Sequence, residues 1–235
     1  MSQAVRRTAL VTGANRGIGL ALVEALLERD WQVIACCRDP ARAEALAALA
    51  AGGAVEMLRL DVASLLSIAD LLAALDGRPI DLLVSNAGIT GPVESFDATN
   101  ASAWQPVFET NLLGVIRLMQ GLKPNILASR GKKAVAISSG MGSIAGAAGS
   151  DHLAYRCSKA ALNMALHAAA GEWAADGATV AMLTPGVVDT DMTAHLSLPK
   201  ISAAESAAGM VAIIERLGVS DAGRFFRYNG EEVAW

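Results

Sequence analysis

The fold is decided by the stretch Thr8-Ala9-Leu10-Val11-Thr12-Gly13-Ala14-Asn15-Arg16-Gly17-Ile18-Gly19. A short β-rich run is followed by a glycine-rich turn and then by helical periodicity. Glycines in such a turn let the backbone approach a pyrophosphate, which then lies against the amide N–H groups and positive dipole of the helix N-terminus. The spacing is Gly-x-x-x-Gly-x-Gly, which differs from the usual Gly-x-Gly-x-x-Gly fingerprint. The stretch therefore predicts an α/β unit that binds a nucleotide.

Strand-like and helical segments alternate along the rest of the chain. The expected strands are 8–11, 31–36, 55–60, 80–84, 133–138, 179–183 and 224–228. The expected helices are 18–29, 40–51, 65–75, 103–129, 155–174 and 203–217. Such alternation implies right-handed βαβ units and a parallel sheet covered on both faces. We expect a single doubly wound Rossmann-type α/β domain over residues 1–235, with a central parallel sheet of about seven strands.

Composition excludes several classes of function. The 235 residues are 53% hydrophobic and 18% charged, with a net charge of -4 and no basic cluster, which argues against nucleic acid as a partner. The sequence has no run of about 20 apolar residues, so no membrane span is expected, and residues 1–7 lack a signal-peptide core. The three cysteines fit neither a disulfide framework nor a zinc site, so we expect reduced thiols, no metal and a cytoplasmic location.

The end of the second strand indicates which nucleotide is bound. NAD sites usually place a carboxylate there to accept a hydrogen bond from the ribose 2′-hydroxyl. Here the strand leads into Arg38, and the first carboxylate is Asp39. Arg38 and Arg16 stand where a 2′-phosphate would lie, and arginine binds phosphate by paired hydrogen bonds. The cofactor expected is NADP(H), although both arginines are also of a kind common on surfaces.

Tyr155 and Lys159 are candidates for the chemistry. Their four-residue separation places a phenol and an ammonium on one face of the expected helix 155–174. A nearby cation favours the phenolate, so Lys159 is expected to lower the pKa of Tyr155 toward neutrality. Such a tyrosine suits proton donation during carbonyl reduction. The pair alone is weak support, because tyrosine and lysine at this spacing also occur on solvated helices.

Together these features resemble the short-chain dehydrogenase/reductase family. Seven elements occur in the family's order: the turn 12–19, Asp61-Val62, Asn86-Ala87-Gly88, Asn111, Ser138-Ser139, Tyr155 with Lys159, and Pro185-Gly186 with Thr190 beyond. The resemblance runs from residue 12 to about residue 192. The stretches 155–163, 189–192 and 230–235 further resemble the C-factor and sniffer type of small carbonyl reductases.

The resemblance assigns four catalytic roles. Tyr155 would donate a proton to the carbonyl oxygen as hydride arrives from the nicotinamide, and Ser139 would stabilise the charge that develops on that oxygen. Strand alternation and family register favour Ser139 over Ser138. Lys159 would bind the nicotinamide ribose and lower the pKa of Tyr155. Asn111 would hold a water that passes protons to Lys159.

The resemblance also implies a set of cofactor-binding residues. Asp61 and Val62 would border the adenine, Asn86 to Gly88 would line the cleft, and Thr190 would hold the carboxamide. Asn86 is equally suited to tying strands together, and Asp61 to capping the next helix. The full set is Gly13, Asn15, Arg16, Gly17, Ile18, Gly19, Arg38, Asp61, Val62, Asn86, Ala87, Gly88, Tyr155, Lys159, Pro185, Gly186, Val188, Thr190 and Met192.

One segment departs from the family pattern. Ser139 and Tyr155 are separated by a longer glycine-rich stretch, 140–150, than is usual, which we interpret as a longer active-site loop. His152 lies close to Tyr155, where it would touch substrate, act as an auxiliary acid or simply be a loop residue. Beyond the sixth strand, residues 190–204 are expected to form a substrate lid containing Pro199, in which Met192, His195 and Leu196 would close over substrate.

The function expected is NADPH-dependent reduction of an aldehyde, ketone or quinone, with a small-molecule carbonyl substrate. One alternative is NAD-dependent alcohol oxidation, which comparison of NADPH with NADH would separate. Another is a nucleotide-binding signalling protein without activity, which carbonyl turnover would exclude. The resemblance leaves the oligomeric state open: helices 103–129 and 155–174 carry faces that pair in many family members, as a homodimer or homotetramer would require, and monomers also occur in the family.

Overall fold

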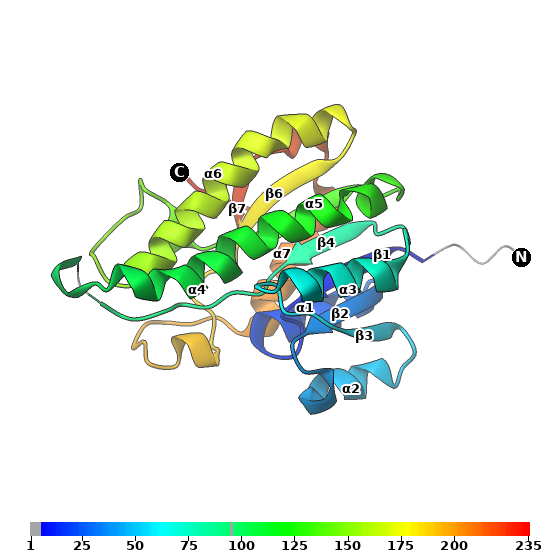
Figure 1. The fold of residues 1–235 in the computed structure, drawn as a ribbon, viewed down its shortest axis with the longest axis horizontal. Helices are drawn as coiled ribbons and strands as arrows, with labels where there is room; N and C mark the ends of the chain where they lie inside the picture. The colour runs from blue at the N-terminus through cyan, green and yellow to red at the C-terminus, as the bar shows by residue number, and fades with distance from the viewer. Residues whose placement is uncertain (1–5, 95) are drawn as a thin grey trace, which may run out of the picture.

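The computed structural model describes residues 6–94 and 96–235, arranged around a seven-stranded parallel sheet (Figure 1). The strands are β1 (Thr8–Thr12), β2 (Gln32–Cys37), β3 (Val55–Arg59), β4 (Leu82–Ser85), β5 (Lys133–Ile137), β6 (Thr179–Thr184) and β7 (Phe225–Arg227). Their spatial order is β3-β2-β1-β4-β5-β6-β7, and every neighbouring pair is parallel. The order reverses between β1 and β4, which is where doubly wound sheets bind ligands. The predicted fold class and strand number are confirmed.

Helices cover both faces of the sheet (Figure 1). They are α1 (Gly17–Leu27), α2 (Glu44–Ala50), α3 (Leu65–Leu75), α4 (Gln105–Phe108), α5 (Gly114–Leu127), α6 (Leu153–Ala175) and α7 (Ala203–Arg216). Helices α1, α2 and α7 share one core cluster with Val11 of β1, whereas α3, α5 and α6 share the other with its neighbour Leu10. Adjacent strand residues point to opposite faces, so the strands are apolar on both sides.

Two expected helices are interrupted. Helix 40–51 was predicted as continuous, but a 3-10 turn, Pro40–Arg42, precedes α2, and Ala43 between them leaves helical geometry with φ -94° and ψ 65°. Helix 103–129 is divided into a 3-10 turn at Ala101–Trp104, the short α4, a π-helical turn at Glu109–Leu113 and α5. The extra residue of a π-turn is common at functional sites, and this one contains Asn111.

Smaller shifts occur at the ends of elements. The predicted strand 80–84 begins two residues later, because the backbone N–H of Ile80 donates to the Asn125 carbonyl of α5 at 3.1 Å instead of joining the sheet. Helix α6 begins at Leu153, two residues earlier than predicted, which places Tyr155 in its first turn.

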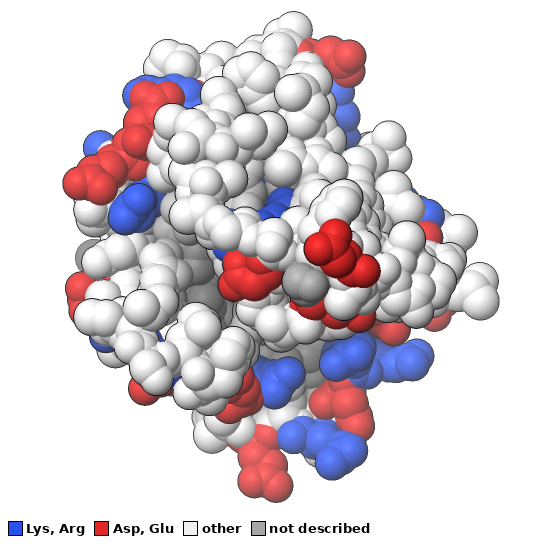
Figure 2. Space-filling view, turned by 90° about the vertical axis from the view of Figure 1, so that its left-hand side faces the viewer, with Lys and Arg blue, Asp and Glu red and all other residues white. Residues whose placement is uncertain are grey.

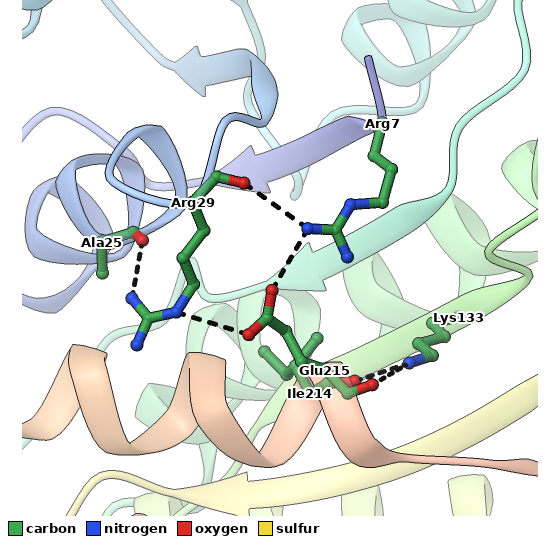
Figure 3. Close-up of polar contacts among 6 residues, drawn as sticks. All are labelled: Arg7, Ala25, Arg29, Lys133, Ile214 and Glu215. Atoms are coloured by element: carbon green, nitrogen blue, oxygen red, sulfur yellow. Dashed lines mark hydrogen bonds and ion pairs between the residues drawn. The ribbon is translucent and has the colours of Figure 1, made fainter. Parts of the chain in front are cut away.

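Polar contacts fix the end of α7 against the amino-terminal edge of the sheet (Figure 3). Glu215 accepts from Arg7 at 3.2 Å and pairs with Arg29 at 3.4 Å. Lys133 Nζ donates to the carbonyls of Ile214 and Glu215 at 2.8 and 3.0 Å. These carbonyls lie at the helix C-terminus, where a cation is favourable. This edge is thus occupied by structural ion pairs, whereas the chemistry-bearing residues gather at the opposite, carboxyl edge.

The sequence led us to expect neither a membrane-spanning segment nor a metal site. None of the helices within residues 6–94 and 96–235 is long and apolar enough to span a membrane. The expectation about residues 1–7 falls largely on residues 1–5, which lie outside the described part of the chain. Within that described part, no three His, Cys, Asp or Glu residues gather as a metal site would require.

Candidate active site

The glycine turn joins β1 to α1 at the carboxyl edge of the sheet. Gly13 and Gly17 have φ values of 65° and 54°, which L-residues adopt rarely. Gly19 approaches the turn so closely that an added Cβ would lie 2.1 Å from the Gly13 carbonyl oxygen and 2.6 Å from Asn86 Nδ2. Helix α1 begins at Gly17 with no side-chain cap on its first N–H groups. Those free N–H groups can donate hydrogen bonds to a phosphate, so the turn fits the predicted dinucleotide.

Asn86 fastens this turn to the end of β4. Its Nδ2 donates to the carbonyls of Thr12 and Gly13 at 2.9 and 3.3 Å. Thr12 Oγ1 in turn accepts from the backbone N–H groups of Asn86 and Ala87, both at 3.0 Å. Asn86 therefore ties two strands together, the structural role considered from the sequence, and it does so at the floor of the predicted cofactor cleft.

The residues expected to read the adenosine end lie at the ends of β2 and β3. Arg38 directly follows β2 and is exposed. Arg16 is also exposed, but its guanidinium pairs with Asp191 at 2.9 Å, a contact that the sequence did not suggest. Asp61 accepts from the Ala63 N–H at 3.0 Å in a local turn, and the adjoining Val62 is buried.

Asp61 does not cap helix α3. The N-cap is Ser64, whose side chain accepts from the Ser67 N–H at 3.3 Å. The carbonyl of Val62, the residue after Asp61, lies against the start of α5: an added Cβ on Gly114 would be 2.4 Å from that oxygen. The alternative role for Asp61, capping the next helix, is therefore wrong.

Two adjacent serines at the end of β5 have different surroundings. Ser138 is buried and donates to Asn163 Oδ1 of α6 at 2.6 Å. Ser139 is half-buried, and its Oγ accepts from the Met141 N–H at 3.2 Å. Its hydroxyl also forms a hydrogen bond with Tyr155, which acts to lower the pKa of the phenol. The strand's alternation, which favoured Ser139 as the residue facing the cleft, agrees with this arrangement.

Tyr155 and Lys159 face each other, with Lys159 Nζ 5.8 Å from the centroid of the phenol ring. The predicted lowering of the Tyr155 pKa is wrong for this structure. Burial raises the pKa of Tyr155, and the hydrogen bond with Ser139 opposes that rise only in part. Burial also lowers the pKa of Lys159 to about 8, since its ammonium donates to the Ile137 carbonyl at 2.8 Å and is otherwise removed from water. Desolvation of both groups outweighs their attraction.

Asn111 is fully buried and forms three hydrogen bonds within the protein. Its Oδ1 accepts from the Ile89 N–H at 2.9 Å, and its Nδ2 donates to the Ile89 carbonyl and to Ser158 Oγ at 2.8 and 3.0 Å. An added Cβ on Gly88 would lie 3.2 Å from Asn111 Oδ1 and 3.7 Å from Lys159 Nζ. Asn111 thus joins the loop after β4 to α6, beside a space that the glycine leaves free near Lys159.

Ser158 is a contributor that the sequence analysis missed. It accepts from Asn111 and donates to the Tyr155 carbonyl at 2.8 Å. It therefore fixes the helical turn that carries both Tyr155 and Lys159. Its position between these two residues, one helical turn after Tyr155, was the available signal, but a serine there is common enough to pass unnoticed.

The segment after β6 returns to the glycine turn. Gly186 has a φ of 81°, and Val188 pairs with Ile201 in a bridge that closes the base of the lid segment, residues 190–204. Thr190 lies against the turn, because an added Cβ on Gly17 would be 3.5 Å from Thr190 Cγ2. Among the other predicted residues here, the Pro185 carbonyl accepts from Ser206 Oγ at 2.7 Å, and Met192 is exposed.

These loops face the viewer in Figure 2, which views the side of the molecule at the left of Figure 1. The surface there is hollowed, and its basic and acidic side chains are interspersed. The structure thus brings together, at one edge, a glycine-rich turn, a buried lysine, a tyrosine and a serine. That edge can hold a dinucleotide and place a proton donor beside it, so the cofactor expected from the sequence fits these residues.

Comparison with known proteins agrees with the fold. The model of the short chain dehydrogenase family matches residues 7–200, and the chain belongs to that family. It is an NAD(P)-dependent dehydrogenase/reductase, and it is similar to carbonyl reductases. The Myxococcus xanthus protein named C-signal is 34% identical over 158 residues, which cover 67% of this chain and 93% of that protein.

Two solved structures are similar over nearly their whole length. The NADPH-bound carbonyl reductase from chicken fatty liver has a TM-score of 0.88 and 32% identity, covering 98% of this chain and 99% of that one. Carbonyl reductase Sniffer of D. melanogaster has a TM-score of 0.88 and 29% identity, covering 98% and 100%.

Proposed function

We propose that this protein reduces the carbonyl group of an aldehyde, ketone or quinone with NADPH, using Tyr155 as general acid. The observation that carries the proposal is the arrangement of Tyr155, which forms a hydrogen bond with Ser139 and has Lys159 Nζ 5.8 Å from the centroid of its ring. Burial raises the pKa of Tyr155, so the phenol is protonated at neutral pH and has a proton to give. Reduction needs that protonated form, whereas alcohol oxidation needs the phenolate.

The neighbouring side chains support the same direction of reaction. NADPH, when bound, supplies the hydride that reaches the carbonyl carbon. Ser139, beside Tyr155, would donate a hydrogen bond to the carbonyl oxygen and stabilise the negative charge that develops there. Below a pH of about 8, Lys159 carries a positive charge that stabilises the phenolate left after proton transfer. Lys159 would also bind the nicotinamide ribose, and a water near Asn111 would return a proton from solvent.

The preference for NADPH over NADH rests on two exposed arginines. Arg38 follows β2 directly, in the position where an NAD site would carry a carboxylate. Arg16 would share the 2′-phosphate with it, in a bidentate contact of the kind that arginine makes. NADPH bound to the chicken carbonyl reductase agrees with this preference. We expect NADPH to be favoured by at least about tenfold, equivalent to about 1.4 kcal/mol.

The test is turnover of a panel of aldehydes, ketones and quinones with each cofactor. Wild type should oxidise NADPH in the presence of at least one carbonyl class. Tyr155→Phe should fold, bind NADPH and lose two or more orders of magnitude in rate, the usual weight of general acid catalysis. Near-normal turnover by Tyr155→Phe would reject the mechanism. Equal use of NADH would reject the arginine clamp. A rate that appears only in the direction of alcohol oxidation would favour that alternative.

A further inference from the structure

His152 has three unusual properties for a residue beside a proton donor. Its φ of 54° and ψ of 38° place it in the left-handed region, which non-glycine residues seldom occupy. Its side chain is 92% buried, and Nδ1 has no hydrogen-bond partner. Buried polar atoms are nearly always paired, so an unpaired one indicates a missing partner. The mechanism proposed above makes no use of this imidazole.

His152 lies close to Tyr155 along the chain. His152 is the N-cap of α6, and Tyr155 is the third residue of that helix. An N-cap side chain usually accepts from a backbone N–H of the first turn, but His152 makes no such contact. Its buried Nδ1 therefore has no hydrogen-bond partner among the described residues.

The surrounding loop holds His152 in this strained conformation. Arg156 Nε donates to the Asp151 carbonyl at 2.8 Å, and its NH2 group donates to Asp151 Oδ1 at 2.7 Å and to the Ala148 carbonyl at 3.2 Å. The His152 carbonyl itself accepts from the Arg156 N–H at 2.9 Å. Strain of this kind persists where neighbouring contacts impose it, and it occurs often at ligand sites.

The lid segment covers the imidazole from the other side. The ring of His195 lies 6.0 Å from that of His152, centroid to centroid, with the planes tilted by 38°. His195 is exposed. An added Cβ on Gly91 would meet Ala154 at 3.9 Å, so the loop after β4 packs against the first turn of α6, close to His152. The imidazole pair thus lies where the lid segment meets the helical turn that carries Tyr155.

We infer that His152 recognises a second oxygen on the substrate, so that the site favours ketones bearing a hydroxyl on a carbon near the carbonyl. The inference rests on the proposed carbonyl reduction. Tyr155 and Ser139 bind the reacting oxygen, and His152, one helical turn away, hydrogen-bonds the second. A hydroxyl both donates and accepts, so it pairs with either tautomer of a neutral imidazole. A simple ketone leaves His152 unpaired and is turned over less efficiently.

The experiment compares 3-hydroxybutan-2-one with butan-2-one, which differ by one hydroxyl. The measured quantity is the ratio of the kcat/KM values of the two ketones with NADPH. The two ketones differ in intrinsic reactivity, but this difference is the same for every variant, so it cancels when the ratios of two variants are compared. His152→Gly should lower that ratio about tenfold while the melting temperature stays the same or rises, because glycine relieves the left-handed strain. His152→Asn, which tolerates φ > 0 and keeps a polar group, should retain most of the ratio. Met164→Ala, an exposed change on α6, is the matched control.

The outcomes separate this inference from the proposed function. A ratio in His152→Gly within twofold of wild type overturns the recognition role, as does a loss of melting temperature without a change in ratio. If wild type reduces neither ketone, the proposed function fails for this class of substrate. The His152 inference is then decided by the dissociation constants of both ketones from the unreactive NADP⁺ complex. Equal constants for 3-hydroxybutan-2-one in wild type and His152→Gly would reject it.

Discussion

Lys159 Nζ donates a 2.8 Å hydrogen bond to the carbonyl oxygen of Ile137, at the end of β5. The ammonium is 4% exposed, so this carbonyl replaces most of its hydration. A single neutral acceptor compensates a buried charge poorly, which is why the pKa of Lys159 falls to about 8. The buried Lys159 ammonium thus reduces the stability of the folded protein, as expected of a residue retained for function.

Lys159→Met should therefore stabilise the cofactor-free protein. In the wild type the pKa of Lys159 is lowered from 10.5 to about 8. Burying the charged ammonium therefore reduces the stability of the folded protein by roughly 3 kcal/mol, and this full destabilisation is present below pH 8. Loss of the Ile137 hydrogen bond offsets part of the gain, leaving a net stabilisation of about 1 to 2 kcal/mol at pH 7. As pH rises from 8 to 10.5 the wild-type lysine deprotonates, so the difference should shrink. Denaturant unfolding at pH 7 and pH 9.5 measures both effects.

A partly exposed lysine provides the control for that experiment. Lys123 pairs with Asp176 at 2.7 Å near the surface. Lys123→Met should change the free energy of unfolding by at most about 1 kcal/mol, and this change should be the same at pH 7 and at pH 9.5. If Lys159→Met is less stable than wild type at pH 7, burial does not dominate the energetics of this lysine.

The glycine turn leads to a second prediction, in which one substitution has opposite effects at two sites. Gly19→Ala would place Cβ 2.1 Å from the Gly13 carbonyl oxygen, so the turn or α1 must shift. We expect a loss of at least about 3 kcal/mol in stability and loss of cofactor binding. Gly171, inside α6, is exposed, and an added Cβ there meets no atom within 4 Å. Gly171→Ala should stabilise by about 1 kcal/mol. Thermal unfolding with and without NADPH distinguishes the two.

The ion pair between Arg16 and Asp191 leads to a third prediction. Asp191 belongs to the lid segment and occupies the guanidinium that we assign to the 2′-phosphate. Exposed pairs contribute about 0.2 to 1 kcal/mol, so Asp191→Asn should tighten NADPH binding by up to about fivefold. NADH has no 2′-phosphate, and its dissociation constant should not change.

A carboxylate at the base of the lid segment serves as the matched control for the ion pair. Asp189 pairs with Lys200, at 3.5 Å. Asp189→Asn should leave the affinities for both cofactors as they are. Weaker NADPH binding by Asp191→Asn would mean that Asp191 helps to hold Arg16 in its binding position.

Sequence patterns predicted the sheet and the position of the site because both follow from local rules. Apolar runs bounded by turns gave the strands, and the carboxyl ends of parallel strands meet at one edge, so the glycine turn, Ser139 and Tyr155 had to be neighbours. The pKa of Tyr155 was predicted to be lowered, whereas burial raises it. Spacing revealed the nearby Lys159 cation but not the burial of both groups, which depends on helices and loops distant in the sequence. The Arg16–Asp191 contact joins residues 175 positions apart and has no local signal.

The long loop between Ser139 and Tyr155 leads to a fourth prediction. Its Ser143 donates to the Ala234 carbonyl, and its Ala145 N–H donates to the Trp235 carbonyl, both at 2.6 Å. The Trp235 ring packs 4.9 Å from His167 and 5.8 Å from Phe225, centroid to centroid. Trp235→Ala should release this anchor, speed amide exchange over residues 143–149 and lower stability by about 1 kcal/mol.

We interpret the stretch 140–150 as an active-site loop, so the loosened variant should also have a higher KM for ketones. Trp235→Phe keeps an aromatic ring against His167 and is expected to behave nearly as wild type. Exchange over residues 143–149 that is equally slow in Trp235→Ala would show that Ser143 alone holds the loop.

The last prediction concerns the lid segment itself, whose closing over substrate stays a proposal. Its base is fixed, since the backbone N–H of Asp189 donates to the Ile201 carbonyl and that of Ile201 to the Val187 carbonyl, each at 2.9 Å. Residues 194–200 between these contacts are mostly exposed. A loop held at its base and free at its tip can close without unfolding its neighbours.

We therefore expect NADPH to slow amide exchange over residues 194–203, through contacts at Thr190, and a bound ketone to slow it further by excluding water. Met192, 41% exposed without ligand, should then lie against substrate. Met192→Ala would change the ranking of large against small carbonyl substrates more than it changes the rate with the smallest aldehyde. Exchange that stays fast through both additions, with an unchanged ranking, would mean that these residues are a surface loop without a part in binding.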